Sequence, residues 1–323
     1  MNAAQLLDGF RGLRAVVIGD LMLDEYIHGH ATRISPEAPV IVVRQSRVEA
    51  VPGGAANVAH NMAALGAIPT LVGVVGDDAG GRQLAASLTE GGTATHLVID
   101  PSRPTTRKTR ILADQAHQIL RIDHEDDRQV MGDTEASLVE AITRAVQGTD
   151  VVVVSDYLKG ALTPAVVDAI RAACGSIPMI VNAKPKSARQ YHGATLVQMN
   201  RAEVTLALGL DSLPDSDASA KAIEMRKAID CHHVLVTLGG SGMAAASSSQ
   251  TLAVAAPRVA VFDTAGAGDT VIATVALGMA TAGFRSEVFE LAAAASAAVV
   301  RKVGVAVPSI EDLSAIRTGQ PEA

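Results

Sequence analysis

A glycine-rich run near residue 265 combines a carboxylate with two closely spaced glycines. It reads Asp263-Thr264-Ala265-Gly266-Ala267-Gly268-Asp269 and leads into a long helix-like pattern. Glycines can take backbone angles that turn successive N–H groups into one concavity, and a helix N-terminus favours a bound anion. The run therefore predicts an anion hole in which Asp269 could accept a proton from an attacking hydroxyl. The alternative is a turn whose aspartate only caps the helix.

Two further segments carry polar residues at the start of a helix or the end of a strand. Gly53-Gly54-Ala55-Ala56-Asn57 opens a helix, and Asn57 offers both a donor and an acceptor to a polyol. Asp20 and Asp24 follow the first apolar run, where ligands of open α/β sheets bind. Each segment alone could be an ordinary turn. Together they favour a single cleft.

The elements that must position these residues alternate along the chain. Continuous Val/Ile runs predict strands that are buried on both faces of a parallel sheet. These runs are residues 15–18, 71–75, 151–154, 178–181 and 234–237, and a β-like stretch is also expected to end at Phe262. Helices are expected at residues 55–65, 133–147 and 216–229, from Thr163-Pro164, and after the glycine-rich run to about residue 282. The pattern predicts an α/β fold whose central, mostly parallel sheet is flanked by helices.

Two stretches, residues 39–49 and 105–123, alternate polar with apolar residues and have no helix between their strands. Such alternation predicts antiparallel strands with one dry and one wet face, outside the main sheet. We expect a small β-sheet lid, with strands drawn from about residues 20–50 and 105–123. Because no repeat or low-complexity linker interrupts the chain, residues 1–323 are expected to form a single domain.

Composition excludes several classes of protein. The net charge of −7 argues against a nucleic-acid partner, since a phosphate backbone is held by clustered Lys and Arg. Cys174 and Cys231 lack the spacing of a metal or redox site and are expected in the core. The run 291–300 is too short to span a membrane, so we expect a cytoplasmic protein with no membrane partner. The missing Walker A loop and Gly-x-Gly-x-x-Gly fingerprint disfavour P-loop enzymes and dehydrogenases.

The glycine-rich run and the upstream Gly-Gly-Ala-Ala-Asn resemble the two signatures of the ribokinase-like (PfkB-type) carbohydrate kinases. Within that family the chain is most similar to the D-glycero-β-D-manno-heptose 7-phosphate kinases, over nearly its whole length. The closer similarity rests on Gly19-Asp20-Leu21-Met22-Leu23-Asp24, Arg33-Ile34-Ser35-Pro36-Glu37-Ala38-Pro39-Val40, residues 52–58, Ser155-Asp156-Tyr157-Leu158-Lys159-Gly160, and residues 265–272.

The resemblance implies a ribokinase-like fold and ATP with Mg²⁺ as the phosphoryl donor. It implies that the anomeric hydroxyl of heptose 7-phosphate is the acceptor, giving a 1,7-bisphosphate for ADP-heptose and lipopolysaccharide-core synthesis. The resemblance also implies a homodimer through the β-lid. It does not decide whether a monovalent cation binds beside the glycine-rich run, which we call the anion loop. Some relatives carry a second, nucleotidyltransferase domain, which we do not expect within these 323 residues.

The resemblance also assigns roles by position. Asp269 would be the base, and the anion hole would be formed by Gly266, Ala267 and Gly268. The sugar would be held by Asp24, Gly53, Gly54 and Asn57. The nucleotide would be bound by Lys184, Asn200, Glu203, Thr237 and Gly239, with Glu203 reaching Mg²⁺ through water.

The chain departs from the family pattern on the nucleotide side. Asn182 stands where an aspartate is expected, Gln198-Met199 replaces Thr-Pro, and Ala293 replaces an asparagine. One carboxylate fewer weakens the attraction for a divalent ion, so another sugar substrate or a non-catalytic binding protein remain alternatives. Candidates for the substrate's own phosphate are Arg107, Lys108, Arg110 and Arg121, unless they only form a solvated strand face.

Overall fold

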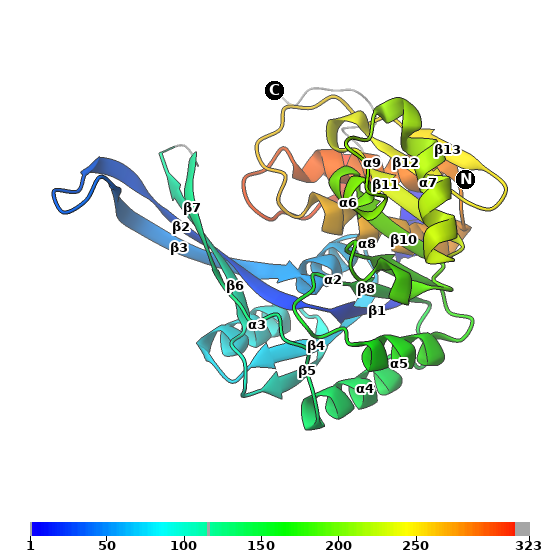
Figure 1. Ribbon diagram of the computed structural model, residues 1–323, viewed down its shortest axis with the longest axis horizontal. Coiled ribbons are helices and arrows are strands. Elements are labelled where there is room, and N and C mark those ends of the chain that lie inside the picture. The colour runs from blue at the N-terminus through cyan, green and yellow to red at the C-terminus, as the bar shows by residue number, and fades with distance from the viewer. Residues whose placement is uncertain (1, 115–116, 314–323) are drawn as a thin grey trace.

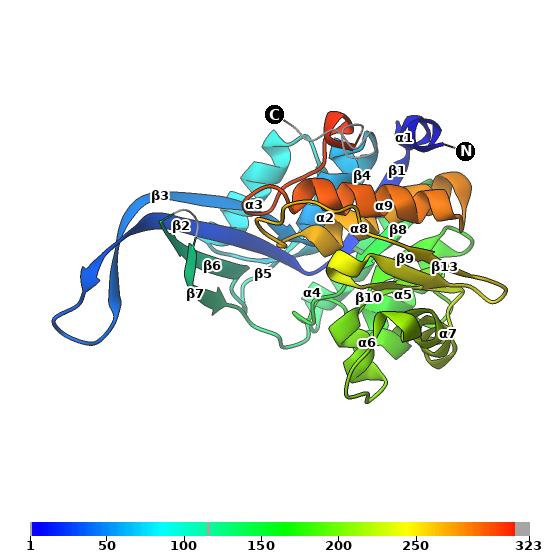
Figure 2. The ribbon, with the colours of Figure 1, turned by 90° about the horizontal axis from the view of Figure 1, so that it is seen from above.

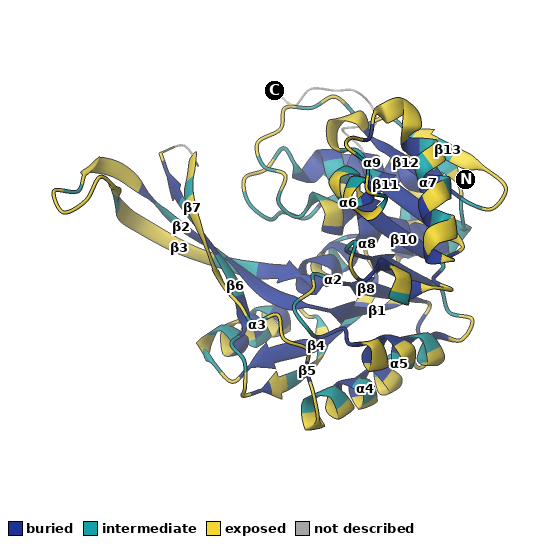
Figure 3. Ribbon diagram, viewed as in Figure 1, coloured by how far each residue is buried: buried dark blue, intermediate teal, exposed yellow. Residues whose placement is uncertain are grey.

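The computed structural model describes residues 2–114 and 117–313. Two sheets organise this part of the chain, one inside a helical body and one in an arm that projects from it (Figure 1). Buried residues concentrate in the central sheet and its covering helices, whereas the projecting arm is largely exposed (Figure 3). The arm leaves the body at the same edge of the central sheet where the predicted site residues lie.

The central sheet has nine strands in the order β13-β12-β11-β10-β9-β8-β1-β4-β5. All neighbours are parallel except β11/β12 and β12/β13. The five predicted apolar runs correspond to β1, β4, β8, β9 and β11, so the prediction of a buried, mostly parallel sheet is confirmed. The strands are β1 Arg14–Gly19, β4 Ile68–Gly76, β5 Ala94–Asp100, β8 Val151–Ser155, β9 Met179–Asn182, β10 Leu196–Asn200, β11 His233–Thr237, β12 Met243–Ala246 and β13 Thr251–Val254.

Helices cover both faces of this sheet (Figure 2). One layer comprises α1 Ala3–Phe10, α2 Ala55–Ala64, α3 Ala79–Glu90, α8 Ala267–Ala282 and α9 Ser286–Val299. The other comprises α4 Asp133–Ala145, α5 Pro164–Cys174, α6 Arg201–Ala207 and α7 Ala218–Ile229. Three short 3-10 turns are η1 Ala188–Tyr191, η2 Asp215–Asp217 and η3 Gly239–Ser241. The expected cap at Thr163 is present, because its side chain accepts from the Val166 N–H.

The second sheet has four strands in the order β3-β2-β6-β7. They are β2 Leu21–Ile34, β3 Ile41–Gly54, β6 Thr106–Ala113 and β7 His117–His124. The expectation of antiparallel strands is correct for β2/β3 and β6/β7 but wrong for β2/β6, which run parallel. The reason is topological, since β2 continues from β1 and β6 from β5, and both parent strands point the same way in the central sheet.

The small sheet has two different faces, as its alternating sequence predicts. Val48, Ile27, Ile111 and Leu120 are cross-strand neighbours and form one apolar row through all four strands. Val48 and Leu120 in this row are each 50% exposed. The adjacent row on the opposite face is polar and contains Glu49, Tyr26, Arg110 and Arg121. We call these the apolar face and the polar face.

The β-like stretch expected to end at Phe262 is not a strand. Residues 255–262 follow an irregular path, and Phe262 is 69% exposed. The chain leaves the edge strand β13 shortly before Pro257, which has no N–H to donate to a ladder. The Phe262 N–H instead bonds the carbonyl of Val300 at 2.8 Å.

Cys174 and Cys231 are buried, as expected of small core residues. Across residues 2–114 and 117–313, none of the helices combines the length and the apolar character needed to cross a bilayer.

Candidate active site

The glycine-rich run forms the start of α8 at the C-terminal edge of the central sheet. Gly266 is the residue before the helix and has a left-handed φ of 78°. The prediction that both glycines adopt unusual angles is correct only for Gly266, because Gly268 lies inside the first helical turn. The first N–H groups of a helix have no carbonyl within the helix to bond. The Ala267 N–H donates to the Thr264 carbonyl at 3.3 Å, so an anion would share or replace that bond.

Asp269 lies in the same turn and is only 4% exposed. Its Oδ1 accepts from the Tyr157 hydroxyl at 2.6 Å, and its Oδ2 accepts from Asn57 Nδ2 at 2.8 Å. Burial raises the pKa of Asp269 to about 6, although both hydrogen bonds act to lower it. The charge of Asp24 raises this pKa further, whereas that of Lys184 lowers it. The group is thus a carboxylate at neutral pH with a proton affinity suited to a general base.

Tyr157 was not predicted as a site residue, although the Ser155–Gly160 segment contributed to the family resemblance. Its loop is fixed by Asp20, whose carboxylate accepts from the N–H groups of Tyr157, Lys159 and Ala161 at 2.8, 3.0 and 3.2 Å. Asp20, expected among the ligand-binding carboxylates, therefore holds the loop instead. Burial raises the pKa of Asp20 to about 6.

The residues assigned to the sugar lie together where the small sheet meets the body. Gly53 faces Asp24 so closely that an added Cβ would come within 2.1 Å of Asp24 Oδ2. Gly54 has a positive φ of 58° and precedes α2, which carries Asn57. Asp24 is buried and ion-paired with Arg110. Asn57 thus bonds Asp269 directly, and the charge of Asp24 acts on it, while Gly53 contacts Asp24.

Lys184, Asn200 and Glu203 form a connected group, and the charge of Lys184 acts on Asp269. Lys184 Nζ lies 2.5 Å from Glu203 Oε1 and 4.9 Å from the centre of the Tyr157 ring. Asn200 and Glu203 form a reciprocal capping box at the start of α6, with bonds of 2.9 and 2.7 Å. Both carboxylate oxygens of Glu203 therefore already have a partner.

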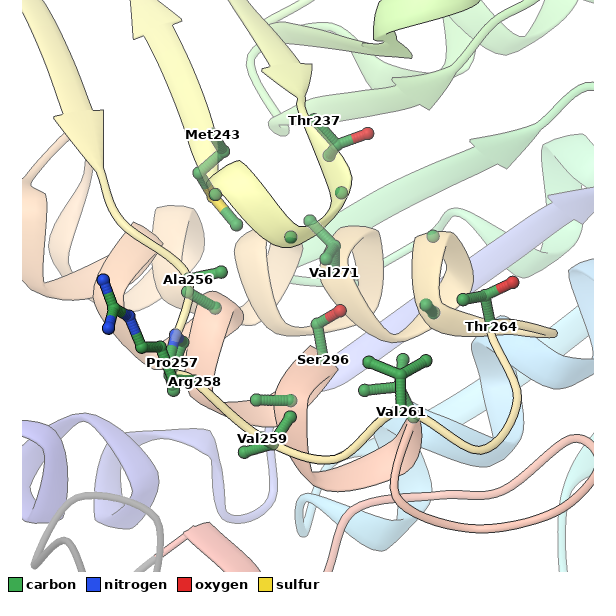
Figure 4. Close-up of a pocket in the computed structure, with 18 residues that line it drawn as sticks. Thr237, Met243, Ala256, Pro257, Arg258, Val259, Val261, Thr264, Val271 and Ser296 are labelled. Carbon is green, nitrogen blue, oxygen red and sulfur yellow. The ribbon is translucent and has the colours of Figure 1, made fainter. Parts of the chain in front are cut away.

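Thr237 and Gly239 line a pocket of about 390 Å³ beside the anion loop (Figure 4). Its walls are the end of β11, the segment 256–261, α8 and α9, and they are mainly apolar. A second, wider cavity of about 1000 Å³ extends from it past α6. The two cavities share Thr237, Gly239, Thr264 and Gly268.

The three departures from the family pattern lie in this nucleotide-side region. Asn182, the last residue of β9, and Gln198, in the middle of β10, are buried cross-strand neighbours. Gln198 Nε2 donates to the Gly268 carbonyl at 3.0 Å, and its Oε1 is buried without a hydrogen-bond partner. Ala293 lines the apolar pocket, where it removes the polar group of an asparagine.

The four basic residues considered for a substrate phosphate all face carboxylates of their own neighbourhood. Arg110 pairs with Asp24, and the others pair within or beside the small sheet. These pairs are Arg107–Glu25 at 4.0 Å, Lys108 with Asp123 and Glu125 at 3.1 and 3.2 Å, and Arg121–Asp123 at 2.9 Å. This pairing favours the interpretation of a charged strand face.

The side chains fit a magnesium ion held mainly by phosphates and water. No group of three His, Cys, Asp or Glu suited to a metal is found among the residues that the structure describes. Mg²⁺ keeps several waters and commonly binds through one or two carboxylates plus substrate phosphates. Glu203 can contribute in that way, but a site made only of protein ligands is not preformed.

Comparison with known proteins identifies the family. The family model described as pfkB family carbohydrate kinase matches residues 13–312. The chain belongs to the pfkB carbohydrate kinases. It is 42% identical over 321 residues to the bifunctional protein HldE of Caulobacter vibrioides, covering 97% of this chain and 65% of that protein. The HldE of Azorhizobium caulinodans is 43% identical over 304 residues, covering 93% and 63%. The chain thus spans about two thirds of the length of these relatives.

Solved structures agree on the fold of this pfkB family member. Phosphofructokinase-2 from Escherichia coli, in complex with potassium, superposes with a TM-score of 0.81 at 20% identity, covering 96% of this chain and 99% of that one. Ribokinase from Arabidopsis thaliana, complexed with ribose and ATP, gives a TM-score of 0.71 at 19% identity over 95% and 98%. These structures show that the fold is ribokinase-like. The class of sugar kinase follows from the match to the family model.

Proposed function

We propose that this sugar kinase transfers the γ-phosphoryl group of ATP to the anomeric hydroxyl of D-glycero-β-D-manno-heptose 7-phosphate. The product would be the 1,7-bisphosphate, an intermediate for ADP-heptose and the lipopolysaccharide core. The heptose assignment rests on the sequence resemblance and on the HldE relatives. The observation that carries the reaction is the buried Asp269 carboxylate, which lies between Asp24 and Asn57 on one side and the nucleotide-side pocket on the other.

In the proposed mechanism, Asp269 accepts the proton of the anomeric hydroxyl as its oxygen attacks the γ-phosphorus of ATP. The bond to the β–γ bridging oxygen breaks, and ADP leaves. The N–H groups of Gly266, Ala267 and Gly268 stabilise the charge on the transferring group. Asp24, Gly53, Gly54 and Asn57 hold the sugar, and their contact with Asp269 through Asn57 supports that role.

The nucleotide is proposed to lie along the two connected cavities. The apolar walls suit a purine ring, and Thr237 and Gly239 line both cavities together with Gly268 of the glycine-rich run. Lys184 would neutralise phosphate charge, and Asn200 would orient Glu203 by the capping box. Glu203 would help to hold Mg²⁺ through water, and the bound ion would neutralise further phosphate charge.

We propose that residues 1–323 act as one domain in the cytoplasm, where ATP is available, with the small sheet as a lid over the sugar. We also propose a homodimer formed through the apolar face of that lid. Its row Val48, Ile27, Ile111 and Leu120 offers a continuous hydrophobic surface on the side away from the polar face. Small exposed sheets of this kind gain stability when a partner covers them.

The substrate assignment is tested by measuring ADP release with a panel of sugars and sugar phosphates. The panel is run with and without potassium, because the phosphofructokinase-2 structure contained that ion. We expect the 7-phosphoheptose with a free anomeric hydroxyl to give the highest kcat/KM. If another sugar is phosphorylated and no 7-phosphoheptose gives detectable activity, the chain is a kinase of that other sugar.

The role of Asp269 is tested in parallel with the Asp269→Asn variant. Loss of a general base is expected to lower kcat by at least ~10²-fold while nucleotide and sugar binding persist. Calorimetric binding of an ATP analogue to the variant provides the control. Full turnover by Asp269→Asn would remove this residue from its role, and binding without turnover in the wild type would indicate a non-catalytic relative.

A further inference from the structure

The carboxylate of Asp269 needs external support to hold one orientation. The terminal torsion of an aspartate has a broad energy profile, so the side chain itself does not fix the carboxylate plane. Asn57 restrains Oδ2, but a single hydrogen bond leaves the group free to rotate about that contact. The second restraint is the 2.6 Å hydrogen bond from the Tyr157 hydroxyl to Oδ1.

We propose that Tyr157 is a positioning residue for the base, because its hydroxyl and Asn57 together fix the carboxylate plane of Asp269 toward the acceptor hydroxyl. This inference rests on the proposed function of Asp269. Each carboxylate oxygen has two lone pairs, so one hydrogen bond to each leaves acceptor capacity for the substrate proton. Tyr157 does not contact the reacting atoms in this scheme and acts through Asp269.

The Tyr157 hydroxyl is suited to this task because it keeps its proton and can donate a hydrogen bond to Asp269. Burial and the charge of Asp269 raise the pKa of Tyr157 well above its ordinary value of 10.0. The phenol therefore keeps its proton throughout the range in which Asp269 titrates. The titratable and charged groups that face Asp269 are Tyr157, Asp24 and Lys184. Of these, Tyr157 and Lys184 stabilise the ionised carboxylate, so loss of the phenol removes one of the two.

The loop that carries Tyr157 is built to be rigid. Asp156 accepts from the Leu158 N–H at 2.9 Å and from the Tyr191 hydroxyl at 2.7 Å, in addition to the three bonds that Asp20 accepts. Leu158 has a left-handed φ of 58°, which is strained for a residue with a side chain. Two buried carboxylates thus maintain a conformation that the chain would not adopt alone.

The ring is held as well as the backbone. Lys184 lies over the Tyr157 ring at 4.9 Å, a cation–π distance. Because Lys184 also pairs with Glu203, the ring is flanked by a cation that is itself held in place. A phenylalanine could occupy the same space, so the hydroxyl can be removed without removing this packing.

The test compares Tyr157→Phe with Tyr26→Phe, which removes a phenol from the small sheet that does not bond Asp269. Because the Tyr157 hydrogen bond lowers the pKa of Asp269, its loss is expected to move the acid limb of the kcat profile to higher pH. We also expect kcat to fall by about 10-fold or more, with the KM for ATP little changed. In an Asp269→Asn background, Tyr157→Phe is expected to cause little further loss. An unchanged acid limb and kcat in Tyr157→Phe would overturn the proposal.

A second measurement separates this inference from the choice of substrate. Carbon-13 NMR titration of the Asp269 carboxyl, assigned by its absence in Asp269→Asn, requires no turnover. An upward pKa shift in Tyr157→Phe but not in Tyr26→Phe supports the hydrogen bond even if every sugar in the panel is inert. The same pKa in wild type and Tyr157→Phe would contradict the inference even if heptose phosphorylation is found.

Discussion

At the scale of single residues, burial and hydrogen bonding have opposite effects on the pKa of Asp269. Burial favours the protonated form of Asp269, whereas donation from Tyr157 and Asn57 favours the ionised form. The balance leaves the pKa of Asp269 at about 6, above its ordinary 3.8. The base is therefore stronger than a solvent-exposed aspartate and still mostly ionised at neutral pH.

We expect kcat to fall as the pH decreases through about 6, since protonated Asp269 cannot accept the hydroxyl proton. The pH dependence of kcat under saturating substrate measures this limb. Asp20 has a similar pKa, but its effect is on stability and has the opposite sign. Its folded-state pKa lies above the unfolded value, so its contribution to the free energy of unfolding declines as the pH rises from about 4 to 6. A kcat that stays flat as the pH falls through the pKa of Asp269 would contradict the prediction.

The sequence predicted Asp269 because a local pattern, two glycines before a helix, surrounds it. Tyr157 has no such local pattern, since it lies 112 residues away from Asp269 and reaches it only through a strained loop. The Asn200 and Glu203 pair was predicted for its chemistry, and the structure shows a helix cap with the same spacing. A short polar motif at a helix start can be a ligand-binding pair or a helix cap, and its spacing is the same in both cases.

At the scale of elements, the junction before α8 depends on one glycine. Gly266→Ala places a Cβ 2.8 Å from Asn57 Nδ2 and forces a left-handed φ on an L-residue. We expect a loss of about 1–2 kcal/mol in the free energy of unfolding, together with a lower kcat because Asn57 must move. Urea unfolding measures the first and steady-state kinetics the second.

Gly268→Ala is the matched control for stability. Its Cβ would meet its nearest neighbour at 3.9 Å, and its backbone is helical. Alanine is the better helix former, so the free energy of unfolding should stay equal or increase. Equal destabilisation by both substitutions would mean that the left-handed angle of Gly266 is not the cause.

Strands buried on both faces were predictable because their residues form continuous apolar runs, which no exposed element would contain. Val151–Val154 in β8, for example, are fully buried between two helical layers. The segment before Phe262 has a similar composition but lies beyond the edge of the sheet, where its apolar side chains line a pocket instead. β12 and β13 were not predicted, since these short segments become strands only through pairing, β12 with β11 and β13 with β12.

At the scale of the whole molecule, the proposed lid and the proposed dimer interface use the same four-stranded sheet. We expect a dimer in analytical ultracentrifugation at micromolar concentration. Leu120→Glu, at the β7 end of the apolar row, should shift the chain to monomer, because it places a charge on the proposed interface. Ile99→Glu is the control, because Ile99 is also exposed but lies on β5 of the body. Dimerisation that survives Leu120→Glu would contradict the proposed interface.

The two hydrogen bonds to Asp269 join distant parts of the polypeptide, across 212 residues to Asn57 and 112 residues to Tyr157. Contacts of such long sequence separation form late, because the chain must first close large loops. A partially synthesised or partially refolded chain could contain the glycine-rich run without an oriented base. An oriented Asp269 therefore requires that the segments carrying Asn57, Tyr157 and the glycine-rich run have all docked.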